Sequence, residues 1–239
     1  MSFDAIRSGV RFNTNILFDT QLYCAIMKLI HKRIDMIKGT IPNYYFIQQM
    51  PEHETRKAAL LESFEKSEFD TIDSPGEQIT ISDWRYAMRP REWTAAFKEF
   101  AKPLVEEVQN ELLADNGMYD AMWFQQYFAT DYHGWHVHNH TNYSSIYLVE
   151  CPDGMATEFF DITTKTKFKE IQLKEGDVIT FPAQVYHRSA PNNTSGRKTI
   201  ISYNCNFTSK TEDAIVKTLG NPEDEWDWEL HDIGSANRQ

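Results

Sequence analysis

The stretch Asp131-Tyr132-His133-Gly134-Trp135-His136-Val137-His138-Asn139-His140 holds four of the eight histidines of this 239-residue chain. On a β-strand, side chains two positions apart point to the same face, so His136 and His138 are expected to project together. A fifth histidine, His187, follows the segment 176–182. Imidazole is the commonest side-chain ligand of transition metals, so these three histidines predict a metal site. The alternative interpretation is a set of solvated loop histidines.

A basic residue stands at a suggestive distance from the last of these histidines. Arg197 lies ten residues after His187 and opens the run 197–204, which is rich in β-branched residues and follows the turn-forming sequence 191–196. This pattern predicts a β-strand. If His187 ends one strand and Arg197 begins its neighbour, the guanidinium lies near the metal and can clamp a carboxylate through two parallel hydrogen bonds. The alternative is a surface arginine beside a turn.

Together these features resemble the iron(II)- and 2-oxoglutarate-dependent oxygenases, in which a strand histidine, a ligand two residues on, a distal histidine and a later basic residue form the site. The prolyl-4-hydroxylase-like branch adds a tyrosine before the first histidine, and Tyr127 stands nine residues before His136. The resemblance covers roughly residues 123–207. The segments that are also similar to oxygenase-like proteins of large tailed phages are 135–138, 144–148 and 175–189.

The resemblance implies an α+β protein with a double-stranded β-helix (jelly-roll) core braced by N-terminal helices. It also implies an enzyme that uses Fe(2+), 2-oxoglutarate and O2 to hydroxylate a substrate. The expected metal ligands, which are also the catalytic residues together with Arg197, are His136, His138 and His187. The residues expected to bind the cosubstrate are Arg197, Tyr127 and Ser202.

One position departs from the family pattern. The family usually has Asp two residues after the first histidine, and this chain has His138. Three neutral imidazoles leave an iron(II) site at +2, whereas one carboxylate ligand leaves it at +1, so the substitution favours anionic ligands and alters the redox balance of the iron. His140 is an alternative third ligand, because it forms another same-face pair with His138. The nearby acids that offer a carboxylate instead are Asp131, Glu158 and Asp161. His133 is expected to lie in a loop or at the rim.

Two other functions stay open at this stage. All-histidine iron sites also occur in cupin-type thiol dioxygenases, which use no oxo-acid, although the usual cupin acid after the histidine pair is missing here. A non-enzymatic reading is a phage structural or binding protein that keeps the jelly roll and a stabilising metal, since a fold does not by itself fix a function.

Composition bounds the partners and the location. The net charge of −11 and pI near 5.2 argue against general nucleic-acid binding, and Arg85, Arg89 and Arg91 are expected to form a solvated rim paired with Glu92. A small molecule or a protein side chain is the expected substrate, and the oligomeric state is left open. The three widely spaced cysteines predict reduced, partly buried thiols. No apolar run is long enough for a membrane span, so a cytoplasmic protein is expected, in the host cytoplasm if phage-encoded.

The chain is expected to form one compact domain with three parts: a helical support region over 1–120, the metal and cosubstrate core over 121–208, and a C-terminal helix with an acidic tail over 209–239. Residues 1–17 are expected to be extended, and the helices are expected over 20–37, 53–68, 91–114 and 211–219, with Pro103 kinking the third or starting a further helix. The expected strands are 78–82, 123–129, 135–138, 144–150, 157–161, 168–173, 177–181 and 199–207.

Overall fold

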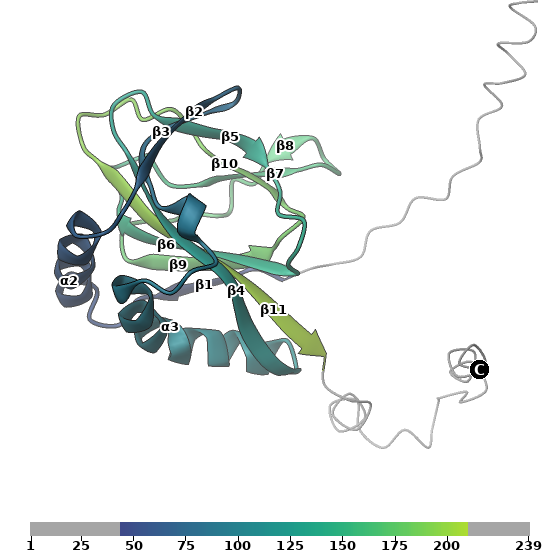
Figure 1. Ribbon diagram of the computed structural model, residues 1–239. Helices are drawn as coiled ribbons and strands as arrows, with labels where there is room; N and C mark the ends of the chain where they lie inside the picture. Colours follow the sequence, from purple (N-terminus) through teal and green to yellow (C-terminus); the bar gives the residue numbers. More distant parts are fainter. Residues whose placement is uncertain (1–43, 210–239) are drawn as a thin grey trace, which may run out of the picture. The chain divides into compact units, whose positions relative to one another are not determined.

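The computed structural model describes residues 44–209, except for the side chains of Asp115 and Ser209, and consists there of strands with two α-helices and one short 3-10 helix (Figure 1). The elements in chain order are β1 (Phe46–Gln49), α2 (His53–Glu65), β2 (Asp70–Ser74), β3 (Glu77–Ser82), η1 (Trp84–Tyr86), α3 (Glu92–Glu111), β4 (Ala114–Tyr127), β5 (Tyr132–His136), β6 (Tyr143–Glu150), β7 (Glu158–Asp161), β8 (Thr166–Lys167), β9 (Asp177–Pro182), β10 (Tyr186–Ser189) and β11 (Lys198–Ser209).

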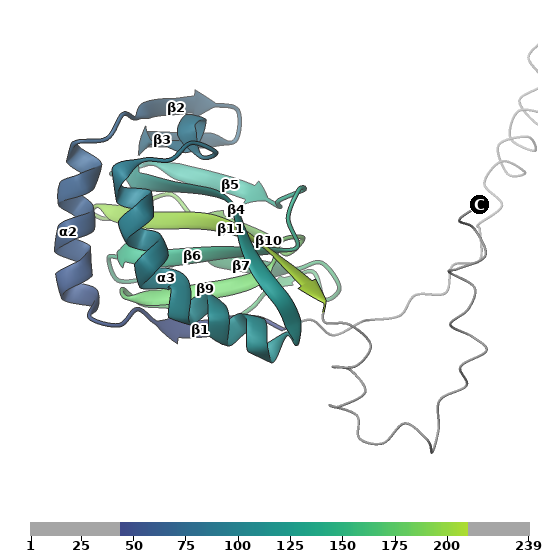
Figure 2. The same ribbon diagram turned by 60° about the horizontal axis from the view of Figure 1, so that its bottom comes forward.

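All strand pairings are antiparallel, and they divide into two groups joined by β3 and β4. The first group has the order β1-β9-β6-β11-β4, and the second has the order β3-β5-β10-β7-β8, with β2 paired to β3. The joint is short, because β3 pairs with β4 only at Ile81 and Ser82. Helices α2 and α3 lie together over one face of the first group (Figure 2).

The alternation of side chains along each strand separates two apolar layers. On β11, Ile201, Tyr203 and Cys205 belong to the layer under the helices, together with Leu60 and Phe64 of α2 and the Trp93–Phe97–Val108 side of α3. The intervening residue Ile200 belongs to the layer between the two strand groups, as do Ile146 of β6 and Phe159 of β7. Residues of β11 with even numbers near 200 therefore face the interior of the jelly roll, where the candidate site lies.

Several sequence predictions are confirmed by these elements. The helix predicted over 53–68 is α2, and the strands predicted over 78–82, 144–150, 157–161, 177–181 and 199–207 are β3, β6, β7, β9 and β11. The helix predicted over 91–114 is one continuous helix, α3, with Pro103 inside it, so the prediction of a second helix at Pro103 is wrong. Cys151 and Cys205 are free thiols, as expected, and Cys24 lies outside the described residues.

Other predictions need correction. The strand predicted over 168–173 is absent, and its apolar residues Phe168, Ile171 and Leu173 pack against the inner core from an irregular segment. β4 begins at Ala114 rather than near 123, since its polar first half is held by pairing with β11. Strands β1 and β2 also add β-structure to the described part of a region that was expected to be helical. The predictions over 1–17, 20–37, 211–219 and the acidic tail lie outside the described residues.

Candidate metal centre

Three histidines come together from β5, the segment that follows it, and the neighbouring strand β10. His136 is the last residue of β5, and it pairs directly across the sheet with His187 of β10. His138 lies two residues beyond the end of β5, where its backbone N–H donates to the carbonyl of Ala183 at 2.9 Å. The predicted strand 135–138 thus ends earlier than expected, yet one ring nitrogen from each of the three histidines lies within 4.8 Å of the other two.

In each imidazole, the Nδ1 atom is hydrogen-bonded to an oxygen of the protein. Nδ1 of His136 lies 2.8 Å from the carbonyl of Gly134, and Nδ1 of His187 lies 3.0 Å from the carbonyl of Val185. Nδ1 of His138 lies 2.7 Å from Oδ1 of Asn204. Because a carbonyl oxygen only accepts hydrogen bonds, each Nδ1 carries the proton, and each Nε2 keeps a lone pair for a metal.

Burial keeps these imidazoles neutral. It lowers the pKa of His136 to about 4 and the pKa of His187 well below its ordinary value, and it also lowers the pKa of His138. Neutral imidazole is the form that binds metal ions. The donor set of three neutral nitrogens therefore fits iron(II) and other divalent transition metals without any prior deprotonation.

His133 was expected in a loop or at the rim, and the loop part of that prediction is wrong. It lies within β5, its ring stacks on His136 at 3.8 Å between centroids, and its Nε2 is 3.3 Å from a carboxylate oxygen of Glu77. Gly134 makes this arrangement fit, since a Cβ there would lie 2.7 Å from the carbonyl oxygen of Gly76. Burial lowers the pKa of His133 to about 4. His133 thus packs against the face of the His136 ring.

The alternative ligands lie elsewhere or already have partners. His140 is exposed and is not part of the cluster of converging nitrogens. Asp131 is buried and accepts the backbone N–H groups of Thr80 and Phe128, which fixes the turn before β5. The other two acids are bound to surface partners: Glu158 pairs with Arg188 and Lys167, and Asp161 accepts from the turn at Thr163 and Thr164.

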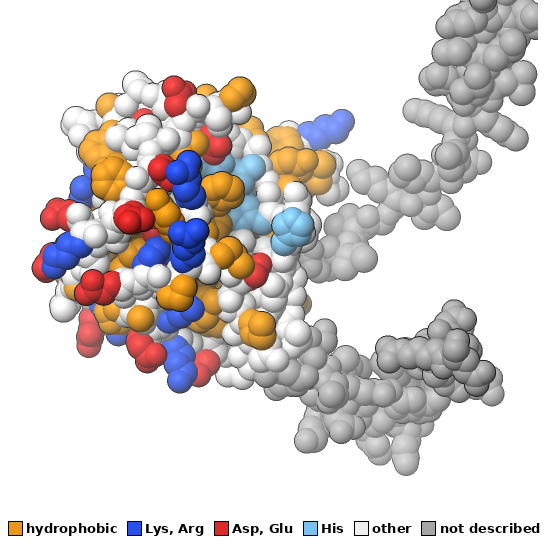
Figure 3. Space-filling model, in the orientation of Figure 1, with side chains coloured by type: hydrophobic (Ala, Val, Ile, Leu, Met, Phe, Trp, Pro, Cys, Tyr) orange, Lys and Arg blue, Asp and Glu red, His pale blue; other side chains and the backbone are white. Residues whose placement is uncertain are grey.

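The three histidines border a small cavity of about 20 Å³. Tyr127 and Ser202, both expected to bind the cosubstrate, line this cavity and are buried. The hydroxyl of Tyr127 donates to Oε1 of Gln125 at 3.0 Å, and burial raises the pKa of the Tyr127 phenol. His136 and His138 are only partly buried, and histidine side chains reach the surface beside hydrophobic ones in Figure 3.

Arg197 and its neighbour Lys198 point in different directions. Arg197 makes a bidentate pair with Glu150, with its Nε at 2.7 Å and its Nη2 at 3.0 Å from the two carboxylate oxygens. Lys198 is fully buried, donates to Oγ of Ser189 at 2.9 Å, and places its ammonium 5.5 Å from the centre of the Tyr127 ring. Sequence reasoning missed Lys198, although strand alternation puts it on the same face as the cavity-lining Ile200 and Ser202.

A second cluster of potential ligands is already neutralised within the chain. Nε2 of His53 lies 3.5 Å from Glu175 and 3.9 Å from Glu54, but the ammonium of Lys57 sits 2.5 Å from the same Glu175 oxygen. Nδ1 of His53 is held by the hydroxyl of Tyr147 at 2.6 Å. This network has its own cation, so it is a weaker metal site than the three-histidine cluster.

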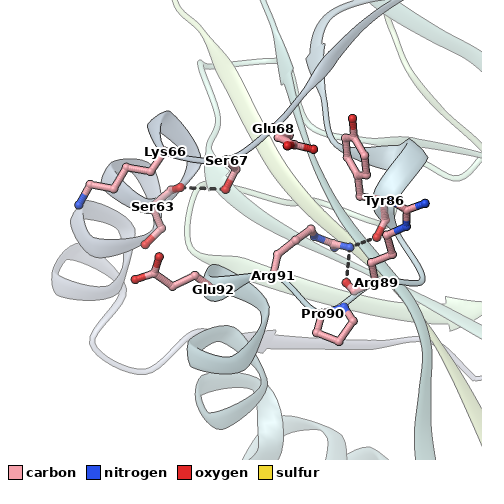
Figure 4. Close-up of a pocket in the computed structure, with 9 residues that line it drawn as sticks. All are labelled: Ser63, Lys66, Ser67, Glu68, Tyr86, Arg89, Pro90, Arg91 and Glu92. Atoms are coloured by element: carbon pink, nitrogen blue, oxygen red, sulfur yellow. Dashed lines mark hydrogen bonds between the residues drawn. The ribbon is translucent and has the colours of Figure 1, made fainter.

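A larger hollow of about 270 Å³ lies between the end of α2 and the start of α3 (Figure 4). Of the three arginines predicted to form a solvated rim, Arg85 and Arg89 are exposed as expected, but Arg91 is not. Arg91 is paired with buried Asp83 at 2.9 Å, not with Glu92, and it donates to the carbonyls of Tyr86, Met122 and Arg89. The contacts of Arg91 in this hollow therefore stabilise the fold.

Comparison with known proteins establishes the fold. No protein-family model matches the chain, and no curated protein sequence is similar to it. Solved structures with the jelly-roll core of 2-oxoglutarate-dependent oxygenases do match, so the predicted double-stranded β-helix is confirmed.

Three of these structures cover most of the described chain. A prolyl-4-hydroxylase from Pseudomonas putida is 12% identical, with 70% of this chain and 92% of that chain covered and a TM-score of 0.51. A 2OG-Fe(II) oxygenase family oxidoreductase from Burkholderia pseudomallei is 8% identical, with 70% and 88% covered and a TM-score of 0.53. A prolyl hydroxylase from Trichoplax adhaerens, in complex with a hypoxia inducible factor peptide fragment, is 13% identical, with 72% and 86% covered and a TM-score of 0.50. At these identities the likeness concerns the fold.

Proposed function

We propose that this protein is a non-haem iron(II)- and 2-oxoglutarate-dependent oxygenase that hydroxylates an organic substrate. One observation carries the proposal: three imidazoles with free Nε2 atoms border a cavity that Tyr127 and Ser189 also line. These two residues are the contacts of a buried lysine, Lys198, which forms no ion pair with a carboxylate among residues 44–209. The imidazoles suit a metal cation, and the lysine suits an anion. A cosubstrate with a metal-chelating end and a distal carboxylate would satisfy both.

Each residue has a distinct task in this proposal. His136, His138 and His187 hold the metal, which supplies the redox chemistry that activates dioxygen. Lys198 binds the distal carboxylate, while the Tyr127 ring and Ser189 hold the ammonium in place. In the proposed reaction one oxygen atom enters a substrate C–H bond as a hydroxyl group. The other oxygen atom converts 2-oxoglutarate to succinate and CO2.

We favour Lys198 over Arg197 as the cosubstrate cation. The guanidinium of Arg197 already has a bidentate partner in Glu150, so a second carboxylate would have to displace the first. Lys198 has lost its water shell and gained only one hydroxyl partner and a ring. A buried ammonium without an anion is costly, and binding of a carboxylate removes that cost.

The test is an anaerobic titration of the protein with iron(II) and then with 2-oxoglutarate. A charge-transfer absorption band that requires both components supports the proposal. Lys198→Met should weaken 2-oxoglutarate binding about tenfold to a hundredfold or more, which corresponds to the loss of one charge-assisted interaction. Arg197→Ala is the matched control and should change the affinity much less. The reverse pattern would return the cosubstrate role to Arg197, and the absence of the band in the wild type would end the proposal.

A cupin-like three-histidine metalloprotein without oxo-acid turnover is the second candidate function. Two observations favour it: the all-nitrogen donor set and a cavity of about 20 Å³, which holds little more than a water molecule. A five-carbon diacid therefore requires side chains around the cavity to move. Tight metal binding with no affinity for 2-oxoglutarate in the titration above would support this candidate.

The substrate class and the setting stay predictions. A small molecule or a protein side chain is the expected substrate, and the peptide bound to the Trichoplax prolyl hydroxylase gives a precedent for the second. No helix within residues 44–209 is long and apolar enough to cross a membrane. The phage origin and the cytoplasmic location remain expectations from the sequence.

A further inference from the structure

His138 differs from the other two histidines in the way that its ring is held. The Nδ1 atoms of His136 and His187 each donate to the backbone carbonyl two residues earlier in their own segment. Those acceptors belong to the main chain, so no side-chain substitution removes them. The Nδ1 atom of His138 instead depends on side chains of two other strands, β6 and β11.

The contact is a closed triangle of three side chains. Oδ1 of Asn204 lies 2.7 Å from Nδ1 of His138, and Oγ of Ser144 lies 3.1 Å from the same nitrogen. Oγ of Ser144 also donates to Oδ1 of Asn204 at 3.2 Å, and the two residues face each other directly across β6 and β11. Asn204 is therefore held in one orientation, with its amide oxygen toward the imidazole.

We propose that Asn204, supported by Ser144, is a positioning residue that makes His138 a metal ligand through Nε2. An amide oxygen accepts but does not donate, so it selects the imidazole form that carries its proton on Nδ1. Free neutral histidine in water favours the opposite form, with the proton on Nε2. In that form Nε2 has no lone pair with which to bind a metal. The inference rests on the proposed three-histidine metal centre.

The arrangement is specific to an imidazole at this position. The main chain of His138 is already fixed by the hydrogen bond from its N–H to Ala183, so the remaining freedom is the rotation and protonation of the ring. An aspartate, which the family usually has here, carries no ring proton and would not need an acceptor at Asn204. The chain thus pairs an unusual ligand with a partner that this ligand requires.

The first test needs no metal. In metal-free protein with ¹⁵N-labelled histidine, long-range ¹H–¹⁵N spectra report which nitrogen of His138 carries the proton. We expect a protonated Nδ1 in the wild type and in Asn204→Asp, which keeps an acceptor oxygen. In Asn204→Ala the proton should shift largely to Nε2. A wild-type His138 with its proton on Nε2 would overturn the inference, and this measurement does not depend on whether the variants fold.

The second test uses cobalt(II) as the probe and calorimetry as the measurement. Asn204→Ala should weaken cobalt binding about tenfold to a hundredfold, and Asn204→Asp should restore it. The matched control is Asn206→Ala on the same strand, where the amide oxygen accepts from the backbone of Asn142 instead; it should change the affinity less than about threefold by the same comparison.

A double substitution separates positioning from general damage to the fold. In a His138→Asp background, Asn204→Ala should have little effect on cobalt affinity, because the carboxylate does not use the amide. An equal loss in both backgrounds would overturn the inference and assign Asn204 a merely structural role. Cobalt binding by the wild type with no change in Asn204→Ala would overturn this inference alone. A wild type that binds no cobalt would overturn the proposed metal centre itself, and the ligand role of His138 with it.

Discussion

Within residues 44–209, Lys198 is fully buried and Arg91 is largely enclosed, and the two cations have different partners. Arg91, directly before α3, has an ion pair with Asp83 and donates to three backbone carbonyls. Lys198, between the strand groups, has one hydroxyl and one aromatic ring. A buried charge whose partners all lie within the chain serves the fold, whereas a buried charge without a counter-ion marks a place for a ligand.

The histidines follow the same division. His53 has both ring nitrogens engaged by the network of Tyr147 and Glu175. His136, His138 and His187 have one nitrogen engaged and the other directed at the cluster. The comparison predicts that ligands bind at the histidines and the lysine whose polar atoms have no charged partner within residues 44–209. The following experiments test this prediction.

The largest effect is expected for removal of a cluster imidazole. His187→Ala deletes a nearly fully buried imidazole that is a proposed ligand and that no other described side chain in the cluster replaces, so bound cobalt or iron should be lost almost completely. His53→Ala and His140→Ala are the controls, and metal analysis should find them fully loaded. Metal that stays in His187→Ala but leaves His53→Ala would move the metal site to the other cluster.

The next effect concerns the paired buried charge. Asp83 is fully buried and accepts from the backbone N–H of Phe124 at 2.7 Å and from the indole of Trp93 at 3.0 Å, besides its pair with Arg91. Asp83→Ala leaves Arg91 without its counter-ion and should lower the free energy of unfolding by about 3–5 kcal/mol. The free energy comes from urea unfolding of the metal-free protein.

The control for this experiment is an ion pair at the surface. Glu62 pairs with Lys66 one helical turn away, and both side chains are largely exposed. Glu62→Ala should therefore change the free energy of unfolding by less than about 1 kcal/mol. If Asp83→Ala costs no more than Glu62→Ala, the distinction between a paired buried charge and a surface charge fails for this protein.

The third effect is the pH dependence of cosubstrate binding. Burial lowers the pKa of Lys198 to about 8 in the protein without ligand. The ammonium form binds a carboxylate, so 2-oxoglutarate affinity should be constant below pH 8 and fall about tenfold for each pH unit above it. The profile is measured anaerobically with metal present. Lys198→Met should give a flat profile, and a wild-type profile that is equally flat would exclude Lys198 as the binding cation.

Much of the fold and the cluster could be predicted from the sequence because both follow local rules. The same-face spacing of His136 and His138, the short apolar runs of β6 and β9, and the helical stripe from Trp93 to Val108 are all readable from neighbouring residues. What failed depended on distant partners. The first half of β4 is polar and is a strand only because β11 pairs with it.

The proposal of Lys198 rather than Arg197 as the cosubstrate cation depends on the same kind of distant contact. Spacing along the chain indicated a cation after His187, but not which of two adjacent cations faces inward. Lys198 lies on the same face of β11 as Ile200 and Ser202, which line the cavity, but the sequence does not say which face of the strand is the inner one. Arg197 is held by Glu150, which lies 47 residues away in sequence. His133 was misassigned for a related reason, since its stacking on His136 depends on the close approach of Gly134 to Gly76.

The smallest effect, on stability, is the one that most sharply separates Lys198 from Arg91. Lys198→Met replaces a buried ammonium by an apolar chain of similar length, so the free energy of unfolding of the metal-free protein should be unchanged or about 1–2 kcal/mol higher at pH 7. The pKa of Lys198 is lower in the folded protein than in the unfolded chain, so wild-type stability should rise as the pH goes from about 8 to 10.5. The variant's advantage should shrink over the same range. If Lys198→Met instead lowers the free energy of unfolding by several kcal/mol at pH 7, as expected for Asp83→Ala, then Lys198 stabilises the fold and is not a binding site for an anion.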